Sequence, residues 1–144
     1  MRKIAPYERK VYYYETDKMG VMHHSNYIRI FEETRVDYLA QAGLPFDVIE
    51  GMGLYMPVLD VSCQYKHPLT FNETFFAELR IEKFNGTTLY LAYTITNKNG
   101  DICAVGTSKH CFTDKSMKPV RIKKSHPEIF AVLSSDLGND EKDQ

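Results

Sequence analysis

The chain lacks an excess of charge of either sign. Its 144 residues carry 18 Lys and Arg against 19 Asp and Glu, which gives a formal net charge of −1 at pH 7. This balance excludes a broad basic surface for nucleic acid, and it is not the strongly charged composition typical of disordered chains. Any anionic ligand must therefore be bound by a few local groups.

Long apolar runs are also missing. No segment approaches the roughly 20 apolar residues that are needed to span a bilayer. The first ten residues, MRKIAPYERK, are charged and have no apolar centre of the kind found in a signal peptide. We therefore expect a cytoplasmic protein with no transmembrane segment and no nucleic-acid partner.

Cysteines and the usual hydrolase signatures are scarce. The three cysteines, Cys63, Cys103 and Cys111, show no CxxC spacing and fall inside apolar runs, which predicts reduced, buried thiols. No Gly-x-Ser-x-Gly motif occurs, so a serine hydrolase is disfavoured. His23 and His24 are adjacent and lack other suitably spaced ligands, so we expect no metal site and no bound cofactor.

The sequence does contain one strong amphipathic helix over residues 26–42. Ser25 or Asn26 can cap its start, and the glycine of Gly43-Leu44-Pro45 can end it. At about 1.5 Å per residue this helix is roughly 25 Å long, and its wide apolar stripe needs a broad cover. The stripe consists of Ile28, Phe31, Arg35, Tyr38, Leu39 and Ala42, and Tyr27 and Ile30 widen it.

Strand patterns account for most of the remaining chain. Residues 74–84, 87–97 and 101–113 alternate apolar and polar side chains, and Asn-Gly pairs lie between them, which predicts an antiparallel meander. Two further strands are predicted at residues 8–16 and 57–66. The predicted fold class is α+β, with a five-stranded antiparallel sheet that curls around one long central helix.

Length and composition are those of one domain. A chain of 144 residues, of which 43% are hydrophobic, can form one substantial core. We expect a single domain over residues 1–133, in which residues 46–53 form a short helix or an irregular segment. Residues 134–144 have no apolar pattern, and we expect them to be a disordered tail.

The candidate chemistry lies between the first strand and the helix, in YYYETDKMGVMHHSNY (residues 12–27). From Tyr13 to Tyr27 this stretch follows the pattern Y-x-x-x-D-x-x-G-V-x-x-H-S-N-Y, which resembles the hotdog-fold acyl-CoA thioesterases. It is most similar to the 4-hydroxybenzoyl-CoA thioesterase group, including its small bacterial acyl-CoA thioesterase branch. The resemblance extends over most of residues 8–120 and implies a hotdog fold.

The resemblance also implies roles for individual residues. Asp17 corresponds to the catalytic carboxylate, which acts as nucleophile or general base at the thioester carbonyl. A backbone N–H at the position of His24 polarises the carbonyl oxygen, and the side chains of Tyr13 and His24 complete the site. The family forms this site between two subunits of a homodimer, which often pairs into a homotetramer. Coenzyme A enters only as part of the acyl-CoA substrate.

Elementary chemistry agrees with these roles. Thioester hydrolysis needs a carboxylate near the carbonyl carbon and donors where the oxyanion develops, and a helix N-terminus supplies unpaired N–H groups. Gly20 lets the loop turn sharply between Asp17 and the helix. The residues expected to bind substrate are Gly20, Val21, Met22, Ser25, Asn26 and Tyr27 in the loop, and Lys118 and Arg121 for the coenzyme A phosphates.

Other interpretations of these residues stay open. Asp17 can be a turn residue, and His24 can cap the helix or pack against Tyr13. Glu33 is an alternative catalytic acid, because another branch of hotdog thioesterases uses a carboxylate on the central helix. The whole chain can instead be a non-catalytic acyl-CoA or fatty-acid-binding module, or a hydratase or dehydratase that acts on enoyl thioesters.

The acyl group is less visible in the sequence. Residues 85–87 lack the basic run that the benzoyl-type enzymes carry at this hairpin. Several methionines, among them Met52 and Met56, can line a pliable apolar pocket. We therefore expect aliphatic acyl-CoA esters to be hydrolysed faster than 4-hydroxybenzoyl-CoA.

Overall fold

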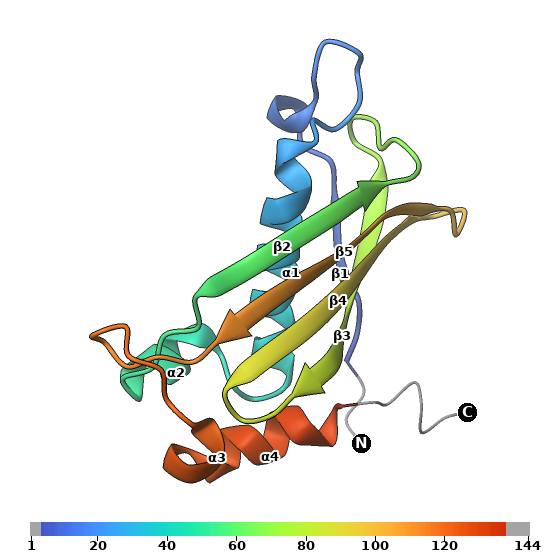
Figure 1. Ribbon diagram of the computed structural model, residues 1–144. Coiled ribbons are helices and arrows are strands. Elements are labelled where there is room, and N and C mark those ends of the chain that lie inside the picture. The colour runs from blue at the N-terminus through green and yellow to red at the C-terminus, as the bar shows by residue number, and fades with distance from the viewer. Residues whose placement is uncertain (1–3, 138–144) are drawn as a thin grey trace.

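The computed structural model describes residues 4–137 and is built on a five-stranded antiparallel sheet (Figure 1). The strand order across the sheet is β1-β3-β4-β5-β2. β3, β4 and β5 are neighbours both in sequence and in space, so the predicted meander is confirmed. The strands are β1 Tyr7–Lys10, β2 Val58–Tyr65, β3 Thr74–Phe84, β4 Thr88–Asn97 and β5 Ile102–Cys111.

The predicted amphipathic helix is α1, which runs from Ser25 to Gln41 and lies across one face of the sheet (Figure 1). The ring of Phe31 is fully buried and stacks on the ring of Tyr93 in β4, with 4.4 Å between the centroids. Gly106 in β5 allows this close approach. A Cβ atom at that position would lie 2.4 Å from Cε2 of Phe31, so a larger residue would force the helix away from the sheet.

The first strand is shorter than the sequence predicts. We expected a strand over residues 8–16, but β1 ends at Lys10 and residues Tyr13–Glu15 form a 3₁₀-helix. Glu15 is buried and forms an ion pair with Arg9 at 2.8 Å, and this contact turns the chain back toward β1. A period-two pattern of side chains does not reveal such a reversal.

Three shorter helices accompany α1. For residues 46–53 the sequence allowed either a short helix or an irregular segment. Most of this segment is helical in the structure, as α2, Phe46–Gly51. The sequence did not predict α3 (Ile122–Ser125) or α4 (Pro127–Ser135), which lie across the lower end of the sheet in Figure 1. The expectation of one helix was therefore incomplete, because α4 buries further apolar side chains at that end of the core.

The predicted disordered tail begins too early. Ser134 and Ser135 belong to α4, and the carboxylate of Asp136 accepts a hydrogen bond from Tyr38 Oη. Asp136 is buried, so the chain packs on the domain beyond the boundary that we expected. The rest of the predicted tail, residues 138–144, lies outside the described residues.

The helices and the three cysteine thiols are the features that bear on the environment of the chain. Within residues 4–137, none of the helices has the length and apolar character that crossing a membrane requires. The thiols of Cys63, Cys103 and Cys111 are all free. Cys103 is buried, which raises its pKa to about 11, whereas the other two are half-buried.

Candidate active site

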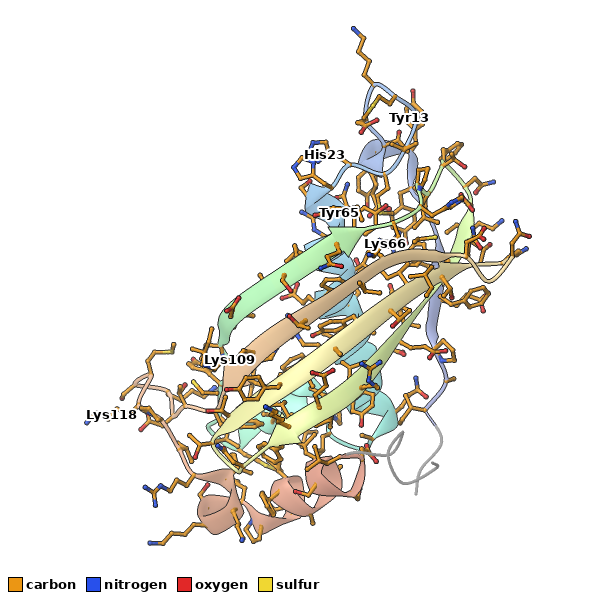
Figure 2. All side chains as sticks on the ribbon, turned by 45° about the vertical axis from the view of Figure 1, so that its right-hand side comes forward. Tyr13, His23, Tyr65, Lys66, Lys109 and Lys118 are labelled. Atoms are coloured by element: carbon orange, nitrogen blue, oxygen red, sulfur yellow. The ribbon has the colours of Figure 1, made fainter. Side chains whose placement is uncertain are left out.

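The candidate site is a short loop at the start of α1, at the end of the molecule where Tyr13 and His23 are labelled (Figure 2). Two backbone hydrogen bonds close this loop: the Asp17 N–H donates to the Val21 carbonyl at 2.8 Å, and the Gly20 N–H donates to the Asp17 carbonyl at 3.0 Å. Gly20 has a φ of +82°, a left-handed conformation that favours glycine. The predicted sharp turn at Gly20 is therefore confirmed.

The carboxylate of Asp17 is half-buried and is held by one of its two oxygens. Oδ1 accepts hydrogen bonds from the Met19 N–H at 2.8 Å and from the Val21 N–H at 3.4 Å. Within residues 4–137, Oδ2 accepts no hydrogen bond, and it is not one of the fully buried unpaired atoms. Asp17 thus stabilises a turn, as the alternative interpretation holds, and also keeps one carboxylate oxygen open to a ligand.

The start of α1 leaves one backbone donor without a partner. His23 occupies two of the donors, since its Nδ1 accepts from the Ser25 N–H at 3.2 Å and its carbonyl accepts from the Asn26 N–H at 3.0 Å. The Tyr27 N–H donates to the carbonyl of His24 at 3.3 Å. In the described part of the chain the N–H of His24 donates to no acceptor. The predicted cap by Ser25 or Asn26 is wrong: His24 occupies the N-cap position, as the alternative held, but its side chain makes no capping hydrogen bond. The His23 ring instead accepts from the Ser25 N–H.

A buried ion pair fixes the backbone beneath the loop. Glu15 is 1% exposed, and its two carboxylate oxygens accept hydrogen bonds from Nη1 and Nη2 of Arg9, each at 2.8 Å. The carbonyl of Glu15 accepts from the His23 N–H at 2.8 Å and from Nδ2 of Asn26 at 2.9 Å. Burial alone would raise the pKa of Glu15, but the hydrogen bonds from Arg9 and the Tyr12 N–H outweigh burial and lower it. The pair therefore anchors both the loop and the first turn of α1.

Glu33, the alternative catalytic acid, is engaged on another side of α1. Its Oε1 accepts hydrogen bonds from Tyr7 Oη and from Arg9 Nε, each at 2.9 Å. Burial and the Glu33 carboxylate together raise the pKa of Tyr7 to about 12. Glu33 thus ties α1 to β1 and is paired with a cation. Among the described residues its Oε2, like Oδ2 of Asp17, accepts no hydrogen bond, so the ion pair with Arg9 is what distinguishes the two acids.

The structure brings some of the predicted site residues together and separates others. Met22, Asn26 and Tyr27 are buried, so they support the loop instead of lining its open side. Lys118 lies at the opposite end of the sheet from Tyr13 in Figure 2, and Arg121 follows it in the chain, so neither reaches the loop within one subunit. The residues gathered at the loop are Tyr13, Asp17, Gly20, Val21, His24 and Ser25.

Tyr65 is a site residue that the sequence did not reveal. It ends β2, and its Oη donates a hydrogen bond to the carbonyl of His24 at 3.2 Å. Its ring meets the rings of His24 and Tyr27 edge to face, with centroids 6.3 and 5.0 Å apart. Tyr65 and His24 are 41 residues apart, so no local spacing could have indicated this contact.

The remaining side chains at the loop are exposed or half-buried. The rings of His23 and His24 lie 4.1 Å apart, and Tyr13, which is 76% exposed, meets the edge of the Phe71 ring at 5.5 Å. In the part of the chain that the structure describes, no group of three His, Cys, Asp or Glu side chains is arranged to hold a metal ion. The groups that this site offers a ligand are a carboxylate oxygen, a backbone donor and exposed rings.

Comparison with known sequences identifies the family. The sequence profile of the thioesterase-like superfamily matches residues 11–131. A protein of Bacillus subtilis, provisionally named acyl-CoA thioesterase YneP, is 34% identical over 126 residues, which cover 87% of this chain and 91% of that protein. The chain therefore belongs to the thioesterase-like superfamily.

Solved structures agree with this assignment. A hypothetical protein from Aquifex aeolicus has a TM-score of 0.83 and 35% identity, with 89% of this chain and 98% of that chain covered. The DHNA-CoA thioesterase of Staphylococcus aureus has a TM-score of 0.86 and 29% identity, with 91% and 89% covered. The predicted resemblance to the hotdog-fold thioesterases is thus confirmed.

Proposed function

We propose that this protein is an acyl-CoA thioesterase, which hydrolyses the thioester of an acyl-CoA to free coenzyme A and a carboxylic acid. One observation carries the proposal: a single loop holds both an open carboxylate oxygen of Asp17 and the unpartnered N–H of His24 at the start of α1. Hydrolysis of a thioester uses these two groups, a carboxylate at the carbonyl carbon and a donor at the carbonyl oxygen. The name of the Bacillus subtilis relative supports the same substrate class.

Asp17 can act in either of two ways. As a general base, its Oδ2 takes a proton from a water molecule whose oxygen attacks the carbonyl carbon; the C–S bond then breaks and the thiolate leaves. As a nucleophile, Oδ2 attacks the carbonyl carbon itself and expels the thiolate, and water then hydrolyses the mixed anhydride.

In both routes negative charge develops on the carbonyl oxygen. The N–H of His24 and the positive end of the α1 dipole stabilise that charge. The thiolate of coenzyme A is a good leaving group, so the reaction does not depend on a strong general acid. The carboxylate, the donor and water suffice, and we propose no cofactor.

The proposal includes a homodimer in which the two sheets meet at β2. β2 is an edge strand, and it exposes four large apolar side chains. Such an edge offers unpaired backbone groups and apolar surface to a second strand. A two-fold pairing of two β2 edges is antiparallel, so it sets the Val58 end of one subunit beside the Tyr65 end of the other. The exposed side chains are Val58, Leu59, Val61 and Tyr65.

This pairing would complete the site from two subunits. Lys118 and Arg121 are exposed and follow the end of β5 that pairs with Val58, so the dimer carries them toward the other subunit's loop. We assign them to the coenzyme A phosphates, for which a guanidinium offers two parallel hydrogen bonds. In this arrangement α1 is the central helix around which the sheet curls, and two dimers can form a homotetramer. The free thiols fit a cytoplasmic location.

A panel of acyl-CoA esters, followed by release of free thiol, tests the function. We expect thiol release from at least one aliphatic acyl-CoA, and light scattering should give at least a dimer at micromolar concentration. A mass near the 16.7 kDa of one chain would contradict the dimer. Acyl-CoA binding without thiol release would favour the binding module, and loss of an enoyl group with the thioester intact would favour a hydratase.

A further inference from the structure

A second polar cluster lies farther along α1, beside a cavity of about 530 Å³. α1, α2 and residues 54–58 form its sides, and Met117 contributes from the segment after β5. The volume falls in the range of about 300–1,000 Å³ that is typical of small-molecule sites. Its apolar wall consists of Val36, Phe46, Ile49, Leu54, Met56 and Val58.

Arg35 lines this cavity and is the cation of the cluster. Arg35 is 7% exposed, and its Nη1 donates a hydrogen bond to Tyr93 Oη at 3.1 Å. None of the ion pairs among the described residues includes Arg35. A guanidinium has five N–H donors and keeps its charge at any ordinary pH, so most of these donors remain for a ligand. None of its nitrogens is both fully buried and unpaired, so its unpaired donors keep some accessible surface.

The groups that contact Arg35 do not supply a negative charge. From Tyr93 Oη the hydrogen-bond chain continues to Ser108 Oγ at 2.6 Å and to His110 Nε2 at 2.7 Å. Burial raises the pKa of Tyr93 more than Arg35 and Ser108 lower it, so its phenol is neutral at pH 7. Burial and the Arg35 charge lower the pKa of His110 to about 4, although the backbone of Met56 and Pro57 acts to raise it. This ring is therefore neutral at pH 7 as well.

Two acids lie near the cavity without pairing to the guanidinium. Glu32 and Glu50 line it, but both are exposed and neither forms an ion pair with Arg35. Lys115 adds a second cation at the surface, with Nζ 4.3 Å from the ring centroid of Tyr55, which also lines the cavity. A buried charge without a partner is costly, and an anionic ligand would remove that cost.

We propose that Arg35 binds a carboxylate at the far end of the acyl group, so that the preferred substrates are thioesters of dicarboxylic acids. The planar guanidinium matches a carboxylate with two parallel hydrogen bonds, and the apolar wall suits the methylene groups between the two carbonyl ends. The inference rests on the proposed thioesterase function and names its substrate class. The expected acyl chain is still aliphatic, but it ends in a second carboxylate.

The proposed dimer would let one substrate reach both places. Within one chain Arg35 lies about three helical turns from His24, roughly 16 Å along α1. Val58 borders the cavity and Tyr65 contacts His24 at the loop, and these two residues are the opposite ends of β2. Antiparallel pairing of two β2 edges therefore brings the cavity of one subunit toward the loop of the other.

Matched pairs of substrates test the proposal. We expect the parent enzyme to hydrolyse glutaryl-CoA and adipyl-CoA with a higher kcat/KM than valeryl-CoA and hexanoyl-CoA. Arg35→Met should lower kcat/KM for the two dicarboxylic thioesters by roughly 10- to 100-fold, which corresponds to loss of a charge-assisted hydrogen bond, and should change the neutral thioesters much less. Arg35→Lys should restore part of the preference. Arg80→Met, the same kind of change at an exposed arginine that does not line the cavity, should keep it.

Binding of free dicarboxylates measures the Arg35 site independently of catalysis. It also provides a test if the Arg35→Met variant folds poorly. Free glutarate should raise the Tm of the parent protein, and Arg35→Lys should weaken that rise while valerate has no effect. Hydrolysis of all four thioesters without preference would overturn the dicarboxylate assignment and leave the thioesterase function standing. Arg35-dependent glutarate binding without any thioester hydrolysis would support the carboxylate site and overturn the thioesterase function. A highest kcat/KM for 4-hydroxybenzoyl-CoA would also overturn the carboxylate.

Discussion

The two ends of α1 use polar groups in opposite ways. At its N-terminal end the ion pair of Arg9 and Glu15 is buried, while Asp17 and His24 keep open groups on the surface of the loop. In the second half of α1 the charged side chain of Arg35 is itself buried, and it lines a cavity. At the first end the buried charges support the backbone and the candidate groups stay accessible, whereas at the second end the candidate group is itself buried.

In our proposal this difference separates reaction from recognition. A reacting carbonyl needs a fixed donor and an accessible carboxylate, so the rigid element at the loop is the backbone. A binding site for one charged group is most selective when its cation is desolvated and already in place. An unsuitable ligand then leaves that cation unpaired, which weakens its binding.

Arg9→Met should remove the buried ion pair beneath the loop. The change leaves the buried carboxylate of Glu15 without its cation and removes one partner of Glu33. We expect the free energy of unfolding to fall by about 3–5 kcal/mol, because the remaining charge is buried and unpaired. Urea unfolding followed by circular dichroism measures the loss.

The neighbouring residue provides the control for this change. Lys10 is exposed and has no ion pair among the described residues. Lys10→Met should therefore change the free energy of unfolding by less than about 0.5 kcal/mol. Equal losses in the two variants would mean that the buried pair does not anchor the loop.

A proline at position 24 should sharpen the assignment of the oxyanion donor. His24 has a φ of −56°, which a proline ring accepts, but proline has no N–H to donate. We expect His24→Pro to lower kcat by about 10²–10³, the usual effect of removing one oxyanion donor. His24→Ala keeps the N–H, so its kcat should fall by less than about tenfold.

The two variants at position 24 are compared only after circular dichroism confirms that both are folded. Equal losses of kcat would assign the function to the imidazole ring. A His24→Pro enzyme with the parental kcat would show that the carbonyl oxygen meets another donor.

The smallest effect concerns the buried histidine in the Arg35 cluster. The pKa of His110 is lowered from 6.5 to about 4, so between these values the unfolded chain binds more protons than the folded one. The stability that His110 contributes is complete above about pH 6.5 and is lost as the pH falls toward its folded pKa. Between about pH 7.5 and pH 5 the loss should be about 2 kcal/mol.

His110→Gln removes this titration and keeps a side chain that can bond to Ser108. Its unfolding free energy should therefore fall less than that of the parent over the same pH range. Thermal or urea unfolding at several pH values gives both curves. Parallel curves would show that His110 is already protonated in the folded protein at mildly acidic pH.

The elements that could be predicted from the sequence are those with local signals. The period of α1 and the Asn-Gly turns around β4 depend on residues close together in the chain, and both predictions are confirmed. The early end of β1 depends on burial of Glu15, and the docking of α4 depends on contacts such as that between Tyr38 and Asp136. No periodic pattern contains those contacts.

The same limit applies to the candidate sites. The motif identified the loop with Asp17 and His24, because its residues are contiguous. Tyr65 reaches His24 only through the pairing of β2 with β5. The helical stripe did place Arg35 with the core residues, but the absence of an ion pair, on which its proposed role depends, is visible only in the folded chain.

Replacement of Asp17 tests whether its carboxylate carries out the hydrolysis. Asp17→Asn keeps the size of the side chain and an oxygen that can accept the turn hydrogen bonds, so the fold should survive. We predict that kcat for acyl-CoA hydrolysis falls by at least about 10², while calorimetry gives a nearly unchanged Kd for the acyl-CoA. Glu33→Gln, measured beside it, should retain most of the parental kcat. An Asp17→Asn enzyme with near-parental turnover, together with an inactive Glu33→Gln enzyme, would contradict the assignment of Asp17 as the catalytic carboxylate.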